Sequence, residues 1–254
     1  MNLPLTPSFR LDGKRALVCG ASRGIGLASA AALAQAGAEV VCMSRDRPAL
    51  EALVHDLRAS GGTASAIAGD VCDISWTRHA IEGHGPLDIF VNSAGAARHT
   101  LFTDVEPEDF DAVAGVNIRA TFFVAQAAAR NMRQHARKGS IITISSQMGH
   151  VGGPERSVYA ATKHATEGMT KSAAIELGRD GIRINTICPT FVRTALSEKT
   201  LSDPERRAWV DARIKLGRLA EVEDIMGAVV FLASDAAAMI TGTSILVDGG
   251  WTAE

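Results

Sequence analysis

The residues Arg15-Ala16-Leu17-Val18-Cys19-Gly20-Ala21-Ser22-Arg23-Gly24-Ile25-Gly26 decide the fold of this chain of 254 residues. The first five form a short apolar run that is typical of a buried strand. A glycine loop follows, and the next segment, from Leu27 to Ala36, is rich in alanine, which favours a helix packed close to a sheet. A strand, a glycine loop and a helix in this order predict a turn that binds the phosphates of a nucleotide.

Each glycine of this loop has its own expected role. Gly20 permits the tight turn, Gly24 lets the backbone approach a pyrophosphate, and Gly26 lets the helix pack against the strand. The free N–H groups at the start of the helix would face the anion. The spacing G-x-x-x-G-x-G differs from the common G-x-G-x-x-G pattern. The predicted cofactor-binding residues of the loop are Gly20, Ser22, Arg23, Gly24, Ile25 and Gly26.

A second motif is formed by Tyr159 and Lys163, spaced as Y-x-x-x-K, with Ser146 thirteen residues upstream (159 − 146). Residues four apart share one face of a helix, so the Lys163 ammonium can lie beside the Tyr159 hydroxyl and favour its phenolate. Tyr159 could then exchange a proton with an alcohol or ketone oxygen, to which Ser146 could donate a hydrogen bond. Taken alone, Y-x-x-x-K is more often a packing residue beside a solvated charge, and the rest of the chain reverses those odds.

Several further segments point the same way, and together with the two motifs they make the chain resemble the short-chain dehydrogenase/reductase family from about Leu11 to Trp251. The resemblance implies hydride transfer between a nicotinamide cofactor and a carbonyl or secondary alcohol, with no metal. It also implies a homotetramer, built from the long helices bearing Asn117 and Tyr159 and from the strand near Ser244 to Val247. The segments are Asp70-Val71, Asn92-Ser93-Ala94-Gly95, Asn117, Pro189-Thr190-Phe191-Val192-Arg193-Thr194 and Leu246-Val247-Asp248-Gly249-Gly250.

The resemblance assigns roles to these residues. Tyr159 would be the acid/base, Lys163 would also hold the nicotinamide ribose, and Asn117 would position a water that links Lys163 to solvent. Asp70 and Val71 would contact the adenine ring. The catalytic tetrad implied is Asn117, Ser146, Tyr159 and Lys163, and the further cofactor-binding residues implied are Asn92, Ala94, Gly95, Pro189, Val192 and Thr194.

Three positions depart from the family pattern. Cys19 stands where threonine is usual, Ser93 replaces the second asparagine of N-N-A-G, and Thr190 replaces the glycine after Pro189. None of the three removes a catalytic group. Thr190 has the largest expected effect, because a β-branched residue restricts the backbone and adds bulk near the nicotinamide site.

Alternating strand and helix patterns predict an α/β fold, a single-domain doubly wound parallel sheet of the Rossmann type with about seven strands and helices on both faces. No repeat or linker marks a second domain, so residues 1–254 are expected to form one unit. The stretch of about 190–217 is a long excursion, in which Ser202-Asp203-Pro204-Glu205 favours a helix start, and it is predicted to be a lid over the substrate. The predicted strands are 15–19, 39–43, 64–68, 87–91, 140–144, 183–188 and 244–247.

The composition of the chain bears on which partners, location and metal sites can be expected. A net charge of −2 and a pI near 6.4 give no support for a nucleic-acid partner. We expect no membrane span, since no apolar run approaches about 20 residues, and a cytoplasmic location, since Met1 to Asp12 lacks the apolar region of a signal peptide. The cysteines show no metal-ligand spacing. His150, four residues past Ser146, either contacts substrate or is structural.

Coenzyme choice depends on the end of the second predicted strand. Ser44 stands where relatives that prefer NAD carry an acidic residue for the ribose hydroxyl. Arg45 follows directly and Arg23 can approach from the glycine loop, and two guanidinium groups suit a 2′-phosphate. The alternative is that Arg45 is an ordinary solvated charge. The sequence therefore predicts NADP as the preferred cofactor, with NAD as a possible second one.

The sequence leaves more than one substrate class open. A small ketone, sugar or polyol is favoured over a β-ketoacyl carrier protein, although Arg98, Arg137 and Arg179 could meet an acidic carrier, because Asp180 opposes the charge of Arg179. A non-catalytic nucleotide-binding regulator is the alternative of another class. The complete tetrad argues against it, since a binding protein needs no such arrangement.

Overall fold

Seven strands lie side by side in one parallel sheet in the computed structural model, which describes residues 3–254. All seven predicted strands are present, and the largest difference is that the fourth begins at Ile89 rather than at residue 87. The strands are β1 (Arg15–Cys19), β2 (Glu39–Ser44), β3 (Ala64–Ala68), β4 (Ile89–Asn92), β5 (Ser140–Ile144), β6 (Arg183–Pro189) and β7 (Ser244–Val247). Both faces of β1 and β5 are buried, as their continuous apolar sequences require.

The strand order β3-β2-β1-β4-β5-β6-β7 reverses direction between β1 and β4. From β1 the chain builds outward through β2 to β3, then crosses back to place β4 on the other side of β1. In open parallel sheets, ligands bind in the crevice at the carboxyl ends of the strands where the order reverses. The glycine loop follows β1 directly and so opens onto this crevice.

Helices cover both faces of the sheet, which confirms the predicted fold class. One apolar layer joins α1, α2 and α9 to the sheet through residues such as Leu33, Leu50 and Val229. The opposite layer joins α3, α5 and α6 through Ile81 and Val124, among others. The helices are α1 (Gly24–Gln35), α2 (Arg47–Ala59), α3 (Ile74–Glu82), α4 (Pro107–Ala114), α5 (Thr121–Gln134), α6 (Ser157–Leu177), α7 (Ala195–Leu201), α8 (Pro204–Asp211) and α9 (Glu223–Ala233).

A six-residue π-helical turn, Gly115–Ala120, joins α4 to α5, so the helix runs without a break from Pro107 to Gln134. This corrects the expectation that no apolar run reaches membrane length. The 28 residues have a stretch of mean hydropathy 1.3, long and apolar enough by composition to cross a bilayer. Half of that stretch is buried inside the fold. Core helices of soluble proteins can be equally long and apolar, so this composition alone is weak evidence for a membrane span.

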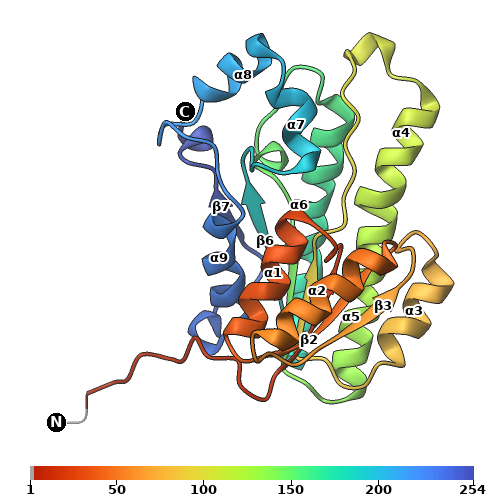
Figure 1. The fold of residues 1–254 in the computed structure, drawn as a ribbon, viewed down its shortest axis with the longest axis vertical. Coiled ribbons are helices and arrows are strands. Elements are labelled where there is room, and N and C mark those ends of the chain that lie inside the picture. The colour runs from red at the N-terminus through yellow and green to blue at the C-terminus, as the bar shows by residue number, and fades with distance from the viewer. Residues whose placement is uncertain (1–2) are drawn as a thin grey trace.

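The excursion after β6 forms two short helices above the end of that strand, α7 and α8, at the top of Figure 1. Its two ends are tied together at the base. Val192 and Ala220 form an isolated parallel bridge, and the Arg193 amide donates to the Ala220 carbonyl at 2.9 Å. The predicted helix start is confirmed, because Asp203 caps α8 by accepting from the amides of Glu205 and Arg206.

Candidate active site

The glycine turn has the geometry that its sequence predicts. Gly20 and Gly24 have φ angles of +75° and +56°, in the left-handed region that favours glycine. A Cβ on Gly26 would lie 2.1 Å from the Gly20 carbonyl oxygen, so only glycine allows α1 to pack this close to the turn. Arg23 precedes α1 without capping it through its side chain. The first amides of α1 are therefore available to an anion.

A cavity of about 880 Å³ opens at the crevice between the carboxyl ends of the strands. It extends from the glycine turn, past the ends of β2 and β4, to helix α7. Its wall brings together most of the predicted site residues. These are Gly20, Ser22, Arg23, Gly24, Ile25, Ser44, Arg45, Asp70, Val71, Ala94, Gly95, Ser146, Tyr159, Lys163, Pro189, Val192 and Thr194.

Three predicted residues lie behind the wall instead of on it, namely Gly26, Asn92 and Asn117. The Asn92 side chain accepts from the Ala94 amide at 3.1 Å and donates to the Thr121 hydroxyl at 3.2 Å, which fixes the turn after β4. Asn92 therefore shapes the cavity through the backbone of its neighbours.

Asn117 lies in the π-helical turn and is buried. Its side chain accepts from the Ala96 amide and donates to the Ala96 carbonyl, both at 2.8 Å, and also donates to the Thr162 hydroxyl at 3.1 Å. Because π-helical turns often occur at functional sites, the insertion at this position is informative. Asn117 ties the loop after β4 to α6 next to Lys163.

Ser146, Tyr159 and Lys163 face the same cavity. The Lys163 ammonium lies 5.5 Å from the centre of the Tyr159 ring and donates to the Ile144 carbonyl at 3.0 Å. Lys163 is buried, and no carboxylate among the described residues pairs with it. The Ser146 hydroxyl donates to the Gln147 side-chain oxygen at 2.7 Å. The arrangement places a cation beside a phenol, with a second hydroxyl at the same cavity wall.

Four further residues, which the sequence patterns did not predict, line the cavity near Tyr159. Gln147 follows Ser146 directly, and Arg156 lies one helical turn before Tyr159, so both spacings held a usable signal. His99 and Thr200 belong to the loop after β4 and to α7, and only the folded chain brings them here. All four carry polar groups suited to a polar substrate.

The adenosine end of the cavity carries the residues predicted to choose the coenzyme. Ser44 is buried, and its hydroxyl accepts from the Asp46 amide at 3.2 Å. The Arg45 side chain is 77% exposed and lies 3.6 Å from the Asp70 carboxylate. Exposed ion pairs at this distance contribute little, so the guanidinium can turn toward a ligand. Arg23 lies at the same end of the cavity.

Thr190 is accommodated without strain in the backbone. Its amide donates to the Val247 carbonyl at 3.2 Å, and it is not among the residues with positive φ. The restriction that a β-branched residue places on the backbone therefore causes no positive φ at Thr190. Thr190 lines the cavity, and its hydroxyl is buried and has no hydrogen-bond partner within the described residues.

His150 lies outside the cavity wall, in a cluster with Glu167 and Cys188. The His150 ring nitrogen is 3.4 Å from the Cys188 sulfur and 4.0 Å from the Glu167 carboxylate. Burial, and after it the Glu167 carboxylate, raises the pKa of the Cys188 thiol to about 12. The three groups are close enough to hold a metal ion, but Glu167 already accepts from the hydroxyls of Thr186 and Ser244. The cluster is a satisfied hydrogen-bond network that supports the structural role of His150.

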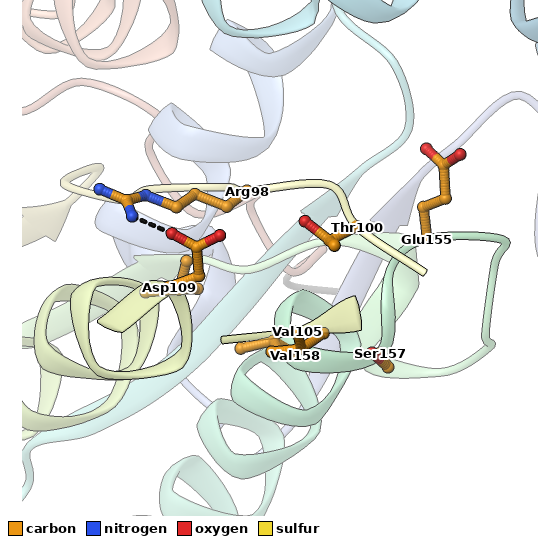
Figure 2. A pocket seen from close by; sticks show the side chains of 8 residues that line it. Arg98, Thr100, Val105, Asp109, Glu155, Ser157 and Val158 are labelled. Atoms are coloured by element: carbon orange, nitrogen blue, oxygen red, sulfur yellow. Dashed lines mark hydrogen bonds and ion pairs between the residues drawn. The ribbon is translucent and has the colours of Figure 1, made fainter. Parts of the chain in front are cut away.

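A second hollow, of about 10 Å³, lies beside the start of α6 and has room for about one water. Arg98 and Asp109 form an ion pair at its edge, drawn as a dashed line in Figure 2. Arg137 pairs with Asp88 at 3.8 Å. Two of the three arginines considered for an acidic carrier therefore already have a carboxylate partner.

Comparison with known proteins agrees with this geometry. A family model described as enoyl-(acyl carrier protein) reductase matches residues 20–252. L-xylulose reductase of Bos taurus is 40% identical, covering 96% of this chain and 99% of that protein. Gluconate 5-dehydrogenase of Gluconobacter oxydans is 39% identical, covering 96% of each. The chain belongs to the short-chain dehydrogenase/reductase family.

Solved structures of this family superpose over nearly the whole chain. A gluconate 5-dehydrogenase from Burkholderia cenocepacia, in complex with NADP and tartrate, is 37% identical with a TM-score of 0.93, covering 97% of this chain and 98% of that one. This short-chain dehydrogenase/reductase is therefore a nicotinamide-dependent oxidoreductase of carbonyl and alcohol groups.

Proposed function

We propose that the protein interconverts a ketone and a secondary alcohol on a polyhydroxylated substrate, with NADP(H) as cofactor and Tyr159 as acid/base. One observation carries the proposal. Tyr159, Ser146 and Lys163 line the same continuous cavity as the glycine turn, so a nucleotide held at the turn reaches the phenol. A non-catalytic nucleotide-binding protein would have no need of this shared wall.

The residues present fit the cofactor. The left-handed glycines and the uncapped start of α1 would hold the pyrophosphate, and Asp70 and Val71 would hold the adenine. The loop from Pro189 to Thr194, which lines the cavity, would hold the nicotinamide end. When bound, the nicotinamide supplies or accepts the hydride.

Side chains of the protein transfer the proton to and from the substrate oxygen. In the reductive direction Tyr159 donates a proton to the carbonyl oxygen, and Ser146 donates a hydrogen bond to the same oxygen. The buried Lys163 ammonium stabilises the phenolate that remains, because it has no carboxylate partner among the described residues. In the oxidative direction the same groups act in reverse.

The substrate class is supported by relatives whose names describe sugar and polyol chemistry, such as L-xylulose reductase and gluconate 5-dehydrogenase. Polar groups on the cavity wall suit several hydroxyls. The β-ketoacyl carrier protein alternative is less supported, since Arg98 and Arg137 are paired with carboxylates. Comparing turnover of an acyl-thioester with that of sugars and simple ketones decides between them.

Replacement of Tyr159 tests the mechanism. Tyr159→Phe keeps the ring and removes the proton, so coenzyme binding should persist while turnover falls by about 10²–10⁴-fold. Nucleotide binding is followed by calorimetry and turnover by the absorbance of reduced nicotinamide. Turnover close to that of the wild type would contradict the assignment.

The assembly and location are also proposed. We infer a homotetramer from apolar side chains left exposed on the long helices and the edge strand, among them Phe122, Ile175 and Leu246. A cytoplasmic location is supported by the four cysteines, which are all unpaired. Residues 190–217 are proposed to act as the lid.

A further inference from the structure

Arg156 is a buried cation at the catalytic end of the cavity. It immediately precedes α6, lies three residues before Tyr159 and is only 7% exposed, yet its side chain lines the cavity. The preceding residue, Glu155, has a φ of +58°, a left-handed conformation that L side chains rarely adopt. Such strain persists where the surrounding structure enforces it, commonly at ligand sites. Here the strained residue directly precedes the arginine that enters the cavity.

Every described contact of the Arg156 guanidinium is with a neutral group or one that is neutral when unprotonated. It meets the ring nitrogens of His99, donates to the Thr200 hydroxyl at 3.2 Å and lies 5.4 Å from the centre of the Phe191 ring. No carboxylate of the described residues lies within ion-pair distance of it. The neighbouring carboxylate of Glu155 is held by Arg206 at 2.8 Å.

The guanidinium is charged at neutral pH. Burial lowers the pKa of Arg156 to about 10, which still leaves the group protonated under physiological conditions. A buried charge without a counter-ion is costly, and proteins compensate it with a partner of opposite sign. Because Arg156 faces the cavity, that partner can be a ligand.

We propose that Arg156 binds a carboxylate of the substrate, so that the enzyme acts on polyhydroxy acids and their keto forms rather than on neutral sugars or polyols. This inference rests on the proposed function and names its substrate class. The two parallel N–H groups of a guanidinium match the two oxygens of a carboxylate. The phosphates of a nucleotide would lie at the start of α1, at the other end of the cavity. Thr200 and Gln147, beside Arg156 and Ser146, can bind hydroxyl groups of the same substrate.

Two pairs of probes isolate the carboxylate. D-Gluconate and D-glucitol share one carbon skeleton and differ at C1, where the first has a carboxylate and the second a hydroxymethyl group. Their C5 ketones, 5-keto-D-gluconate and L-sorbose, form the matching pair for reduction. The wild-type enzyme should show a higher kcat/KM for the acid of each pair.

Arg156→Gln should lower kcat/KM for the acids by about ten- to a hundredfold, as expected for losing a charge-assisted hydrogen bond. The values for the neutral partners should fall much less, because these substrates have no carboxylate. Arg156→Lys keeps the charge without the fork and should fall between. Arg207→Gln is the matched control, because Arg207 pairs with Asp211 on the lid helix α8 and lies outside the cavity.

Arg156 also contacts α7 through Thr200, so a purely structural role has to be distinguished. That role predicts an equal loss of kcat/KM for acids and neutral substrates, and this result would overturn the proposal.

Calorimetry with L-tartrate on the NADP-saturated protein gives a readout independent of turnover. Wild type should bind the dianion and Arg156→Gln should not; binding by both, or by neither, counts against the proposal. If neither member of a pair is turned over while tartrate binding depends on Arg156, the proposed function fails and the anion site stands.

Discussion

At the scale of single residues, we expect the exposed Arg45 to determine the preference for NADP over NAD. Its ion pair with Asp70, at 3.6 Å, contributes little, and the buried Ser44 beside it offers no negative charge to repel a 2′-phosphate. We predict a preference of at least about tenfold for NADP over NAD in kcat/KM, because a charge-assisted hydrogen bond contributes about 1.5–3 kcal/mol. Arg45→Ala should remove most of this preference.

The control for this prediction is Arg47→Ala. Arg47 is also exposed, but it pairs with Glu51 along α2 and lies outside the cavity. Its loss should leave the preference intact. Equal kcat/KM with both cofactors in the wild type, measured from the absorbance of reduced nicotinamide, would show that no arginine recognises the phosphate.

Residues whose chemistry depends on local spacing could be predicted from the sequence. The glycines and the pair Tyr159 and Lys163 belong to this group, since four residues along a helix fix their relation. The spacing of Arg156 from Tyr159 held a signal, but its burial could not be predicted from sequence, because an arginine at a helix start is usually solvated. Only the fold of the loop after β4 and of α7 around it shows that its charge is buried.

At the scale of elements, apolar runs bounded by polar turns predicted the strands. The π-helical turn within residues 107–134 was not predictable. Its formation depends on tertiary contacts of Asn117 with Ala96 and Thr162, which the local sequence does not contain. The same contacts give this turn its role in the site.

Removing the Asn117 side chain should therefore loosen the π-helical turn. Asn117→Ala leaves the half-buried amide and carbonyl of Ala96 without their partners. The free energy of unfolding should fall by about 1–3 kcal/mol, since each lost hydrogen bond contributes about 0.5–1.5 kcal/mol. Urea unfolding measures this change, and Arg119→Ala, an exposed residue of the same turn, is the control. An unchanged midpoint would show that the contacts do not hold the turn.

At the scale of the molecule, the strand order explains where the site lies. Strand patterns alone do not show which strands are neighbours, so the reversal of the strand order between β1 and β4 is known only from the structure. The cavity then gathers residues from the ends of β1, β2, β4, β5 and β6. The sheet thus brings together segments as distant in sequence as Gly20 and Thr194.

The outer surface of the long helices leads to the last prediction, on assembly. Phe122 on α5 and Ile175 on α6 are 46% and 82% exposed, although both helices are otherwise packed on the sheet. A contiguous patch of such side chains marks an interface between subunits, and we propose that these two belong to one. A carboxylate buried there without a partner would be costly, so Phe122→Asp should split the tetramer that we propose into smaller species.

Light scattering at micromolar concentration measures the mass directly. The wild type should give four chains, whereas Phe122→Asp should give fewer while keeping its circular dichroism spectrum. Leu5→Asp is the control, because Leu5 is 91% exposed in the segment before β1, away from both helices. If Phe122→Asp remains a tetramer, the surface of α5 and α6 is not the interface, and the exposed edge strand β7 with Leu246 becomes the next surface to test. A monomeric wild type would instead remove the proposed assembly altogether.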